Sequence, residues 1–200
     1  MARIKPYDIV KSFEESIAEW AGSKYAVAVE SGTAALFLSC LYQKVKEVTI
    51  PKFTYPSVPA SIINAGGRVK FSDIKWSGVY ELEPYHITDG ALRFQKEMYE
   101  GGLHCLSFHI KKHLPIGRGG MILTDDWEAY KWLKLMRFDG REELPLEDST
   151  ISVVGWNMYM TPEQAARGLQ LFELVKNRKN EDLDSEKQGY PDLSKYPIFQ

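Results

Sequence analysis

Residues 25–36 read Tyr-Ala-Val-Ala-Val-Glu-Ser-Gly-Thr-Ala-Ala-Leu, and this stretch decides the fold class. Its first five residues form a short apolar run typical of a buried strand, and residues 34–42 are strong helix formers. Residues 31–33 form a tight turn between them, where free backbone N–H groups and two hydroxyls favour an anion such as a phosphate. On spacing alone, a plain serine cap followed by a glycine turn is the more ordinary interpretation.

The alternation of helix and strand continues on both sides of this stretch. Asp8 is expected to cap a helix with one apolar face that ends at Gly22. Strands are predicted over residues 48–50 and 68–71, with a helix over residues 60–65 between them. Alternating strands and helices favour an α/β fold with a mostly parallel sheet covered on both faces.

The second half of the chain adds three strands and one helix. A short strand over residues 85–88 delivers Asp89 at its carboxyl end, where open α/β sheets bind ligands. Residues 105–108 and 120–124 are predicted as a hairpin-like pair joined by a basic loop. Thr161 begins a helix with a capping box, and beyond Lys176 we expect a fraying helix and an extended tail.

Composition excludes several classes of protein. The 200 residues are 44% hydrophobic and 26% charged, with a formal net charge of −2 and both signs mixed along the chain. This balance gives no reason to expect a nucleic-acid or membrane partner, and we expect a cytoplasmic protein. Cys40 and Cys105 both lie in apolar segments, which favours two buried thiols over a disulfide.

Three polar groups are candidates for chemistry. Asp89 is suited to be a metal ligand, a general base or the partner of a cationic ring nitrogen, and equally a turn residue. Lys111 and Lys112 lie in a glycine-rich region, where a buried lysine becomes a carbonyl nucleophile, although a solvated basic loop fits as well. No metal site is expected, because the histidines and Cys105 lack a second ligand pair at structural-zinc spacing.

Six segments, in this order, resemble the DegT/DnrJ/EryC1/StrS aminotransferases, from the first helix to about Val175. They are residues 31–36 (Ser-Gly-Thr-Ala-Ala-Leu), 51–56 (Pro-Lys-Phe-Thr-Tyr-Pro), 89–91 (Asp-Gly-Ala), 107–112 (Ser-Phe-His-Ile-Lys-Lys), 117–120 (Gly-Arg-Gly-Gly) and 155–160 (Gly-Trp-Asn-Met-Tyr-Met).

The resemblance implies the large domain of a fold type I enzyme that depends on pyridoxal 5'-phosphate. It divides the chain into a reduced cofactor-binding domain, residues 1–175, and a C-terminal tail, residues 176–200. Members of the family are usually nearly twice as long, so the small C-terminal domain is largely missing here, and so is a strand and helix before Asp89. Leu92 and Arg118 replace residue types that are usual in the family.

The resemblance also implies a function and roles for the site residues. Such enzymes move an amino group from glutamate or glutamine to a keto sugar, commonly nucleotide-linked. Lys112 is similar in position to the lysine that binds the cofactor covalently and moves the proton, with Lys111 as its nearest rival. Asp89 is similar to the carboxylate that keeps the pyridine nitrogen protonated.

The remaining matches concern the phosphate and the ring of the cofactor. Gly32 and Thr33 resemble the family's phosphate cradle, with Ser107 adding a hydroxyl. Tyr55 resembles the aromatic residue that stacks on the ring. Asn157 matches a residue that reaches the phosphate from the neighbouring subunit, which implies a homodimer with a shared site.

Two other hypotheses stay open. A protein that binds pyridoxal 5'-phosphate without transaminase activity, as a regulator or a subunit of a complex, would fit the reduced length. A cofactor-free remnant would make the site residues ordinary caps and turns. Arg137 and Arg141 have the chemistry to hold a carboxylate or a sugar phosphate, although surface arginines without a ligand are more common.

Overall fold

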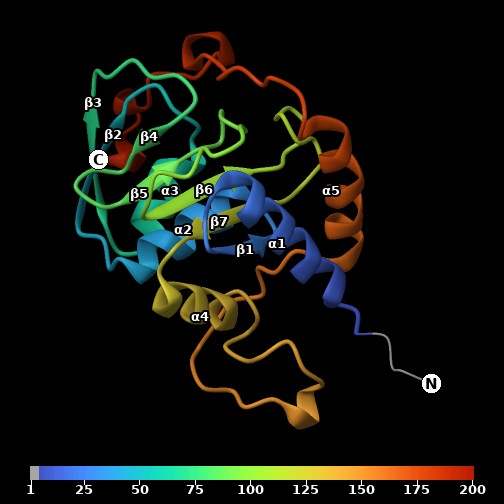
Figure 1. The fold of residues 1–200 in the computed structure, drawn as a ribbon. Coiled ribbons are helices and arrows are strands. Elements are labelled where there is room, and N and C mark those ends of the chain that lie inside the picture. The colour runs from blue at the N-terminus through green and yellow to red at the C-terminus, as the bar shows by residue number, and fades with distance from the viewer. Residues whose placement is uncertain (1–4) are drawn as a thin grey trace.

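A five-stranded sheet with helices on both faces forms the centre of the molecule, which a computed structural model describes over residues 5–200 (Figure 1). The helices are α1 (Asp8–Ala21), α2 (Gly32–Tyr42), α3 (Ser57–Asn64), α4 (Trp127–Met136) and α5 (Pro162–Val175). The strands are β1 (Tyr25–Val29), β2 (Glu47–Pro51), β3 (Arg68–Ser72), β4 (Tyr80–Glu81), β5 (Ile87–Asp89), β6 (Leu103–Ser107) and β7 (Gly120–Thr124).

The sheet is mixed, with the strand order β1-β7-β6-β5-β4. Only β5 and β6 pair in parallel; β1 with β7, β7 with β6 and β4 with β5 are antiparallel. The α/β class and the hairpin-like pair are therefore confirmed, whereas the expected mostly parallel arrangement is corrected to a mixed one. The physical reason is that β7 returns directly after β6 through the loop that carries Lys112. Parallel pairing of β2 with β3 forms a separate two-stranded sheet.

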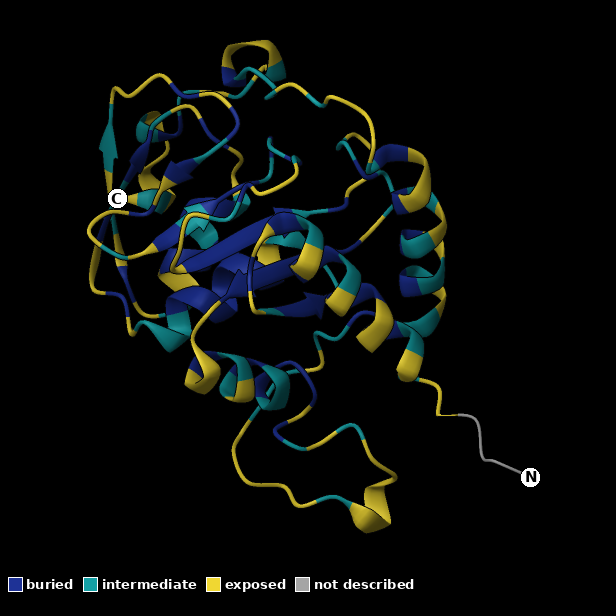
Figure 2. Cartoon of the chain, in the orientation of Figure 1, coloured by how far each residue is buried: buried dark blue, intermediate teal, exposed yellow. Residues whose placement is uncertain are grey.

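The two faces of the sheet build two apolar cores. Alternate residues of β1 point to opposite sides, so Val27 and Val29 pack towards α2 and α4, while Ala26 and Ala28 pack towards α1 and α5. Figure 2 shows this as continuous buried colour along the strands, with exposed residues on the outer helix faces. The sequence pattern of apolar strands thus corresponds to a sheet that is covered on both sides.

Helix boundaries follow local signals in most places. Gly22 ends α1 in the left-handed conformation, at φ +88°, and Thr161 and Gln164 form the predicted capping box of α5. The expectation that Asp8 caps α1 is wrong, because Asp8 is the first helical residue and Tyr7 precedes it without a side-chain cap. Helix α4 was not anticipated, although Asp126 caps it through the Glu128 and Ala129 amides.

The C-terminal tail packs against the body instead of extending from it. After α5 it contains short 3-10 turns, at Ser185–Gln188, Leu193–Lys195 and Pro197–Phe199. Figure 1 shows it, in orange and red, passing from the end of α5 to the side of β2 and β4. Ser185 and Leu193 are buried, and the Leu193 amide donates to the Lys52 carbonyl at 2.9 Å. The expectation of an extended tail is therefore wrong.

A loop between α4 and α5, residues 141–154, projects away from the sheet (Figure 1). Its base is a narrow neck at which Gly140 and Gly155 lie against each other. A Cβ on Gly155 would lie 2.2 Å from the Gly140 amide nitrogen, so the neck closes only because both residues lack side chains. We call this segment the arm.

None of the helices in the described part, residues 5–200, combines the length and apolar character that crossing a bilayer requires.

Candidate functional site

Asp89 is a buried carboxylate at the carboxyl end of β5, with only 4% of its surface exposed. The Tyr80 hydroxyl donates to its Oδ2 at 2.9 Å, and the Ala91 amide donates to its Oδ1 at 3.0 Å. Thr54 in turn contacts the Tyr80 hydroxyl at 2.7 Å. Burial raises the pKa of Asp89, and these hydrogen bonds and Lys112 offset it only in part. The carboxylate is thus held in place without a direct cationic partner among residues 5–200.

Lys112 lies in the β6–β7 loop and is half-buried. Burial lowers the pKa of its ammonium, while the negative charge of Asp89 acts in the opposite direction, so the two groups are within electrostatic reach. Its own amide donates to the His109 carbonyl at 2.8 Å, which fixes the turn. The neighbouring Lys111 is exposed. A lysine that loses its proton more easily is suited to nucleophilic chemistry, which favours Lys112 over its rival.

The turn before α2 lies directly beside Ser107 at the end of β6. A Cβ on Gly32 would lie 2.9 Å from the Ser107 Cβ, so only glycine permits this approach. Ser31 caps α2, since its hydroxyl accepts from the Ala34 amide at 3.1 Å. Thr33 is exposed on the same first turn and lines a cavity of about 430 Å³ between α2, α3 and Trp156. The helix start therefore lies beside Ser107, whereas Thr33 lines the neighbouring cavity between α2 and α3.

Tyr55 lies before α3, with 59% of its surface exposed. Its ring is 6.4 Å from that of Tyr190, which belongs to the tail. Tyr190 stacks on Trp76, and Trp76 packs edge-on against Tyr80 at 4.6 Å. An aromatic cluster therefore surrounds the Asp89 end of the site. Tyr80, Trp76 and Tyr190 could not be predicted as site residues from the sequence, because only long-range packing brings them here.

Asn157 does not join this cluster within the described chain. Its side-chain amide donates to the Asp139 Oδ2 at 3.2 Å, and its backbone pairs with Phe138 beside the neck of the arm. It is exposed, so it remains accessible to another molecule.

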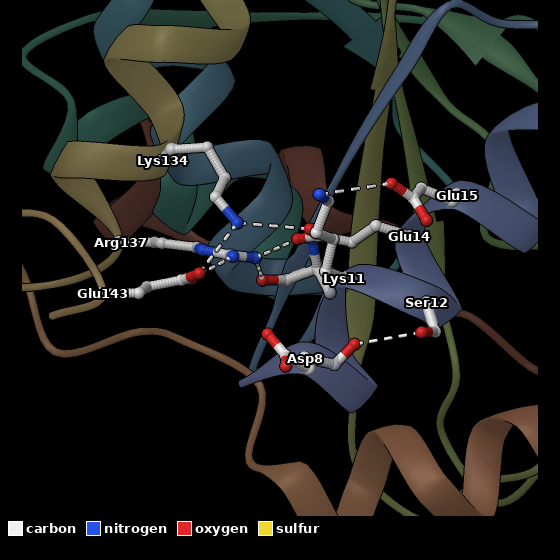
Figure 3. A network of polar contacts seen from close by, with 9 residues as sticks. Asp8, Lys11, Ser12, Glu14, Glu15, Lys134, Arg137 and Glu143 are labelled. Carbon is white, nitrogen blue, oxygen red and sulfur yellow. Dashed lines mark hydrogen bonds and ion pairs between the residues drawn. The ribbon is translucent and has the colours of Figure 1, made fainter. Parts of the chain in front are cut away.

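Arg137 is fully buried and belongs to a network of ion pairs (Figure 3). It contacts Glu14 at 2.5 Å and also Glu143 and the Ala28 carbonyl, while Lys134 bridges the same two glutamates. Arg141 instead lies 4.5 Å above the ring of Phe138 and donates to carbonyls of the arm. Both arginines thus make contacts within the fold, and the interpretation of Arg137 as an ordinary surface arginine is wrong, because it is fully buried.

The two positions that depart from the resemblance have structural roles. Leu92 is fully buried in the core, and its carbonyl accepts from the Leu183 amide of the tail. Arg118 forms an ion pair with Glu30 at 2.7 Å.

Burial and Arg93 lower the pKa of His104 to about 4, so this imidazole is neutral at physiological pH. Over residues 5–200 we find no cluster of three or more side chains suited to bind a metal ion.

Comparison with known proteins identifies the family of this chain. The model of the DegT/DnrJ/EryC1/StrS aminotransferase family matches residues 2–89 and 95–185. A UDP-4-amino-4,6-dideoxy-N-acetyl-beta-L-altrosamine transaminase of Campylobacter jejuni is 24% identical over 225 residues, covering 88% of this chain and 60% of the relative. GDP-perosamine synthase of Caulobacter vibrioides is 26% identical, covering 83% of this chain and 57% of the relative.

The fold has matching solved structures. That of AtS13 from Actinomadura melliaura superposes with a TM-score of 0.73 at 22% identity, covering 85% of this chain and 61% of that one. This chain therefore spans about three fifths of the length of the proteins it matches. On the family match, which extends over most of its residues, the chain belongs to the DegT/DnrJ/EryC1/StrS aminotransferase family.

Proposed function

We propose that this chain binds pyridoxal 5'-phosphate at Asp89 and Lys112 and transfers an amino group from an amino acid to a keto sugar. The observation that carries the proposal is a buried carboxylate that has no direct cationic partner in the described residues and lies within electrostatic reach of a half-buried lysine whose pKa is lowered. Bound pyridoxal 5'-phosphate supplies an electron sink for the carbon that gains or loses the amino group. In this proposal residues 1–175 bind the cofactor and residues 176–200 form the tail.

The turn before α2 fits the phosphate group. The close approach of Gly32 to Ser107 leaves the backbone amides of the helix start and the Ser107 hydroxyl on one side of the turn, without a side chain between them. The helix dipole favours negative charge there. Thr33 adds a second hydroxyl, and Tyr55 provides an exposed aromatic face for the ring.

Each of the two charged residues has one task. Asp89, held by Tyr80 and the Ala91 amide, would accept a hydrogen bond from the ring nitrogen and stabilise its positive charge. Lys112 Nζ, neutral more often than an exposed lysine, would take a proton from the substrate carbon and deliver it to the cofactor. Burial around both groups keeps water from competing for that proton.

The substrate class rests on the relatives. Two of them are named for amino sugars carried on UDP or GDP, which supports a nucleotide-linked keto sugar as acceptor. Glutamate or glutamine is the donor that the family resemblance implies. A second candidate is cofactor binding without transamination, which needs only the residues around Asp89 and Lys112.

The first test is an absorption titration of the full chain with pyridoxal 5'-phosphate, comparing Lys112→Ala with Lys111→Ala. We expect a visible band in the parent and in Lys111→Ala, and none in Lys112→Ala. Lys111 is a matched control, because it is the adjacent lysine but is exposed. Adding glutamate should then convert the band to that of the amine form.

Two outcomes would change the proposal. A Lys112-dependent band that no amino donor alters would favour the binding protein over the transaminase. Absence of any band that depends on Lys112 would overturn the proposed site.

A second copy of this chain is the proposed partner, and the arm is the proposed contact. The arm exposes several large apolar side chains, among them Ile151 at 68% and Val154 at 89%. Such a patch on one projecting loop is typical of an interface. It would also allow Asn157, near its base, to reach the phosphate of the other copy. We expect sedimentation to give a dimer for the parent and a monomer for the double variant Ile151→Asp/Val154→Asp; a monomeric parent would contradict this.

The cytoplasmic location stays a prediction, supported by Cys40 and Cys105, which are both buried free thiols.

A further inference from the structure

The tail contacts two segments of the proposed site. Asp182 forms a two-pronged ion pair with Arg93, at 2.7 Å for the shortest contact, and the Leu183 amide donates to the Leu92 carbonyl. The carbonyl of Glu181 lies 2.8 Å from the His113 ring nitrogen, directly after Lys112 in the chain. The tail therefore contacts both the segment after Asp89 and the loop of Lys112.

Beyond these contacts the tail turns back towards the aromatic cluster. The Ser185 hydroxyl donates to the Trp76 carbonyl at 2.5 Å, and the Trp76 indole donates to the Phe53 carbonyl at 2.9 Å. The buried Leu193 then fixes the chain beside Lys52. Tyr190 lies between these two attachments, so its position is determined by packing on either side.

The ring of Tyr190 has a defined orientation. It is parallel to the Trp76 ring, with 8° between the planes and 6.2 Å between the centroids. Towards Tyr55 it is nearly perpendicular, at 72° and 6.4 Å. Burial, then the charge of Asp89, then Tyr55 raise the pKa of Tyr190 to about 12, so it stays protonated and lies within electrostatic reach of Asp89.

Offset-stacked and edge-on contacts are the geometries in which aromatic side chains hold a further planar ring. Tyr190 lies beyond residues 2–89 and 95–185, which the family model matches, so the family match does not by itself give this tyrosine a role. Its described contacts with Tyr55 and Trp76 are made by the ring.

We propose that Tyr190 is a positioning residue whose ring forms one wall of the pocket that holds a planar heterocycle against Asp89, beside Tyr55. This inference rests on the proposed function. The tail thereby completes the site from within the same chain, and it keeps water away from the carboxylate on the side of Trp76.

The test measures pyridoxal 5'-phosphate affinity and the visible circular dichroism of the bound band in the full chain. We expect Tyr190→Ala to weaken binding about tenfold, as the loss of one aromatic contact with its buried area implies, and to diminish the dichroism. Tyr190→Phe keeps the ring and should bind within about threefold of the parent. Tyr196→Ala, an exposed tyrosine of the same tail, is the matched control and should match the parent.

The outcomes separate the two proposals. Parent-like affinity and dichroism in Tyr190→Ala would overturn the proposed role of Tyr190, but not the proposed roles of Lys112 and Asp89. Tighter binding in Tyr190→Ala would also overturn it, because the tyrosine would then compete with the ring for the same space. Equal losses in Tyr190→Phe and Tyr190→Ala would contradict a role for the ring. A parent chain without a Lys112-dependent band would overturn the proposed function and this inference together.

Discussion

Two clusters of charged side chains are buried in this chain, and only one of them is neutralised by its neighbours. Around Arg137, two cations face two carboxylates, and every charge has an opposite charge within 3.2 Å. Around Asp89, by contrast, hydrogen bonds from neutral groups hold the carboxylate, and Lys112 acts only at longer range.

This difference shows in the pKa values. Burial raises the pKa of Glu143, but Arg137 and Lys134 outweigh it and hold that pKa below its usual value. For Asp89 the effect of burial wins and the pKa is raised. The Arg137 network, in which the charges balance, joins α1, β1 and α4. Asp89, whose charge is not balanced by a direct ion pair, is suited to bind a positively charged group of a ligand.

The largest effect should follow from breaking the balanced cluster. Arg137→Met leaves Glu14 and Glu143 buried with Lys134 as their sole cation, and we expect the free energy of unfolding to fall by about 3–5 kcal/mol. Urea denaturation measures this loss. Arg141→Met is the control, because its contact with Phe138 is worth about 1 kcal/mol or less. Similar losses in the two variants would show that the network does not stabilise the fold more than one surface contact does.

Next in size is the effect of neutralising the unbalanced carboxylate. Asp89→Asn should weaken pyridoxal 5'-phosphate binding by about 2–5 kcal/mol, because a buried charge pair with the ring nitrogen is lost. The cofactor-free protein should be as stable as the parent or more stable at pH 7, since the raised pKa of Asp89 means that ionising it in the fold costs stability as pH rises. Titration and thermal melting test both parts. The exposed Asp73→Asn is the control; a cofactor-free Asp89→Asn that melts much lower would contradict the comparison.

The smallest expected effect is on the stability of the fold at acidic pH. Because the pKa of Glu143 is lowered in the fold, its stabilisation is present above its unfolded pKa of about 4.3 and is lost as pH falls through the lower folded pKa. Glu143→Gln should remove about 1–2 kcal/mol of this acid-sensitive stability at pH 7 and less at pH 3. Urea midpoints at the two pH values measure it. Equal losses at both would mean that packing, not charge, accounts for the contribution.

Elements with strong local signals were predictable from the sequence. The capping box of α5 and the glycine stop of α1 depend on residues within one turn, and both are confirmed. Helix α4 also carried such signals, since Asp126 caps it and Ala129, Leu133 and Met136 recur on one face. Strand direction was not predictable, because an apolar run reads alike for parallel and antiparallel neighbours.

The site could likewise be predicted only where local sequence motifs determine it. The positions of Gly32 beside Ser107, and of Lys112 within reach of Asp89, follow from motifs at strand ends and agree with the resemblance. Tyr80 and Tyr190 carried no comparable signal, because a strand of two residues and an irregular segment are both too short or too irregular to show a hydrophobic period. The tail packs through hydrogen bonds, aromatic contacts and two ion pairs between distant residues, and such contacts leave no pattern in the sequence.

The glycine neck below the arm has a consequence for how this protein can vary. With Gly140 and Gly155 pressed together, the two ends of the arm stay at the same separation whatever lies between them. Doubling the length of a flexible loop costs only about 0.6 kcal/mol of closure entropy. The tip beyond Glu143, which belongs to the Arg137 network, can therefore be lengthened, shortened or changed with little effect on the sheet and on Asp89, so the chain can change its associations while it keeps its fold.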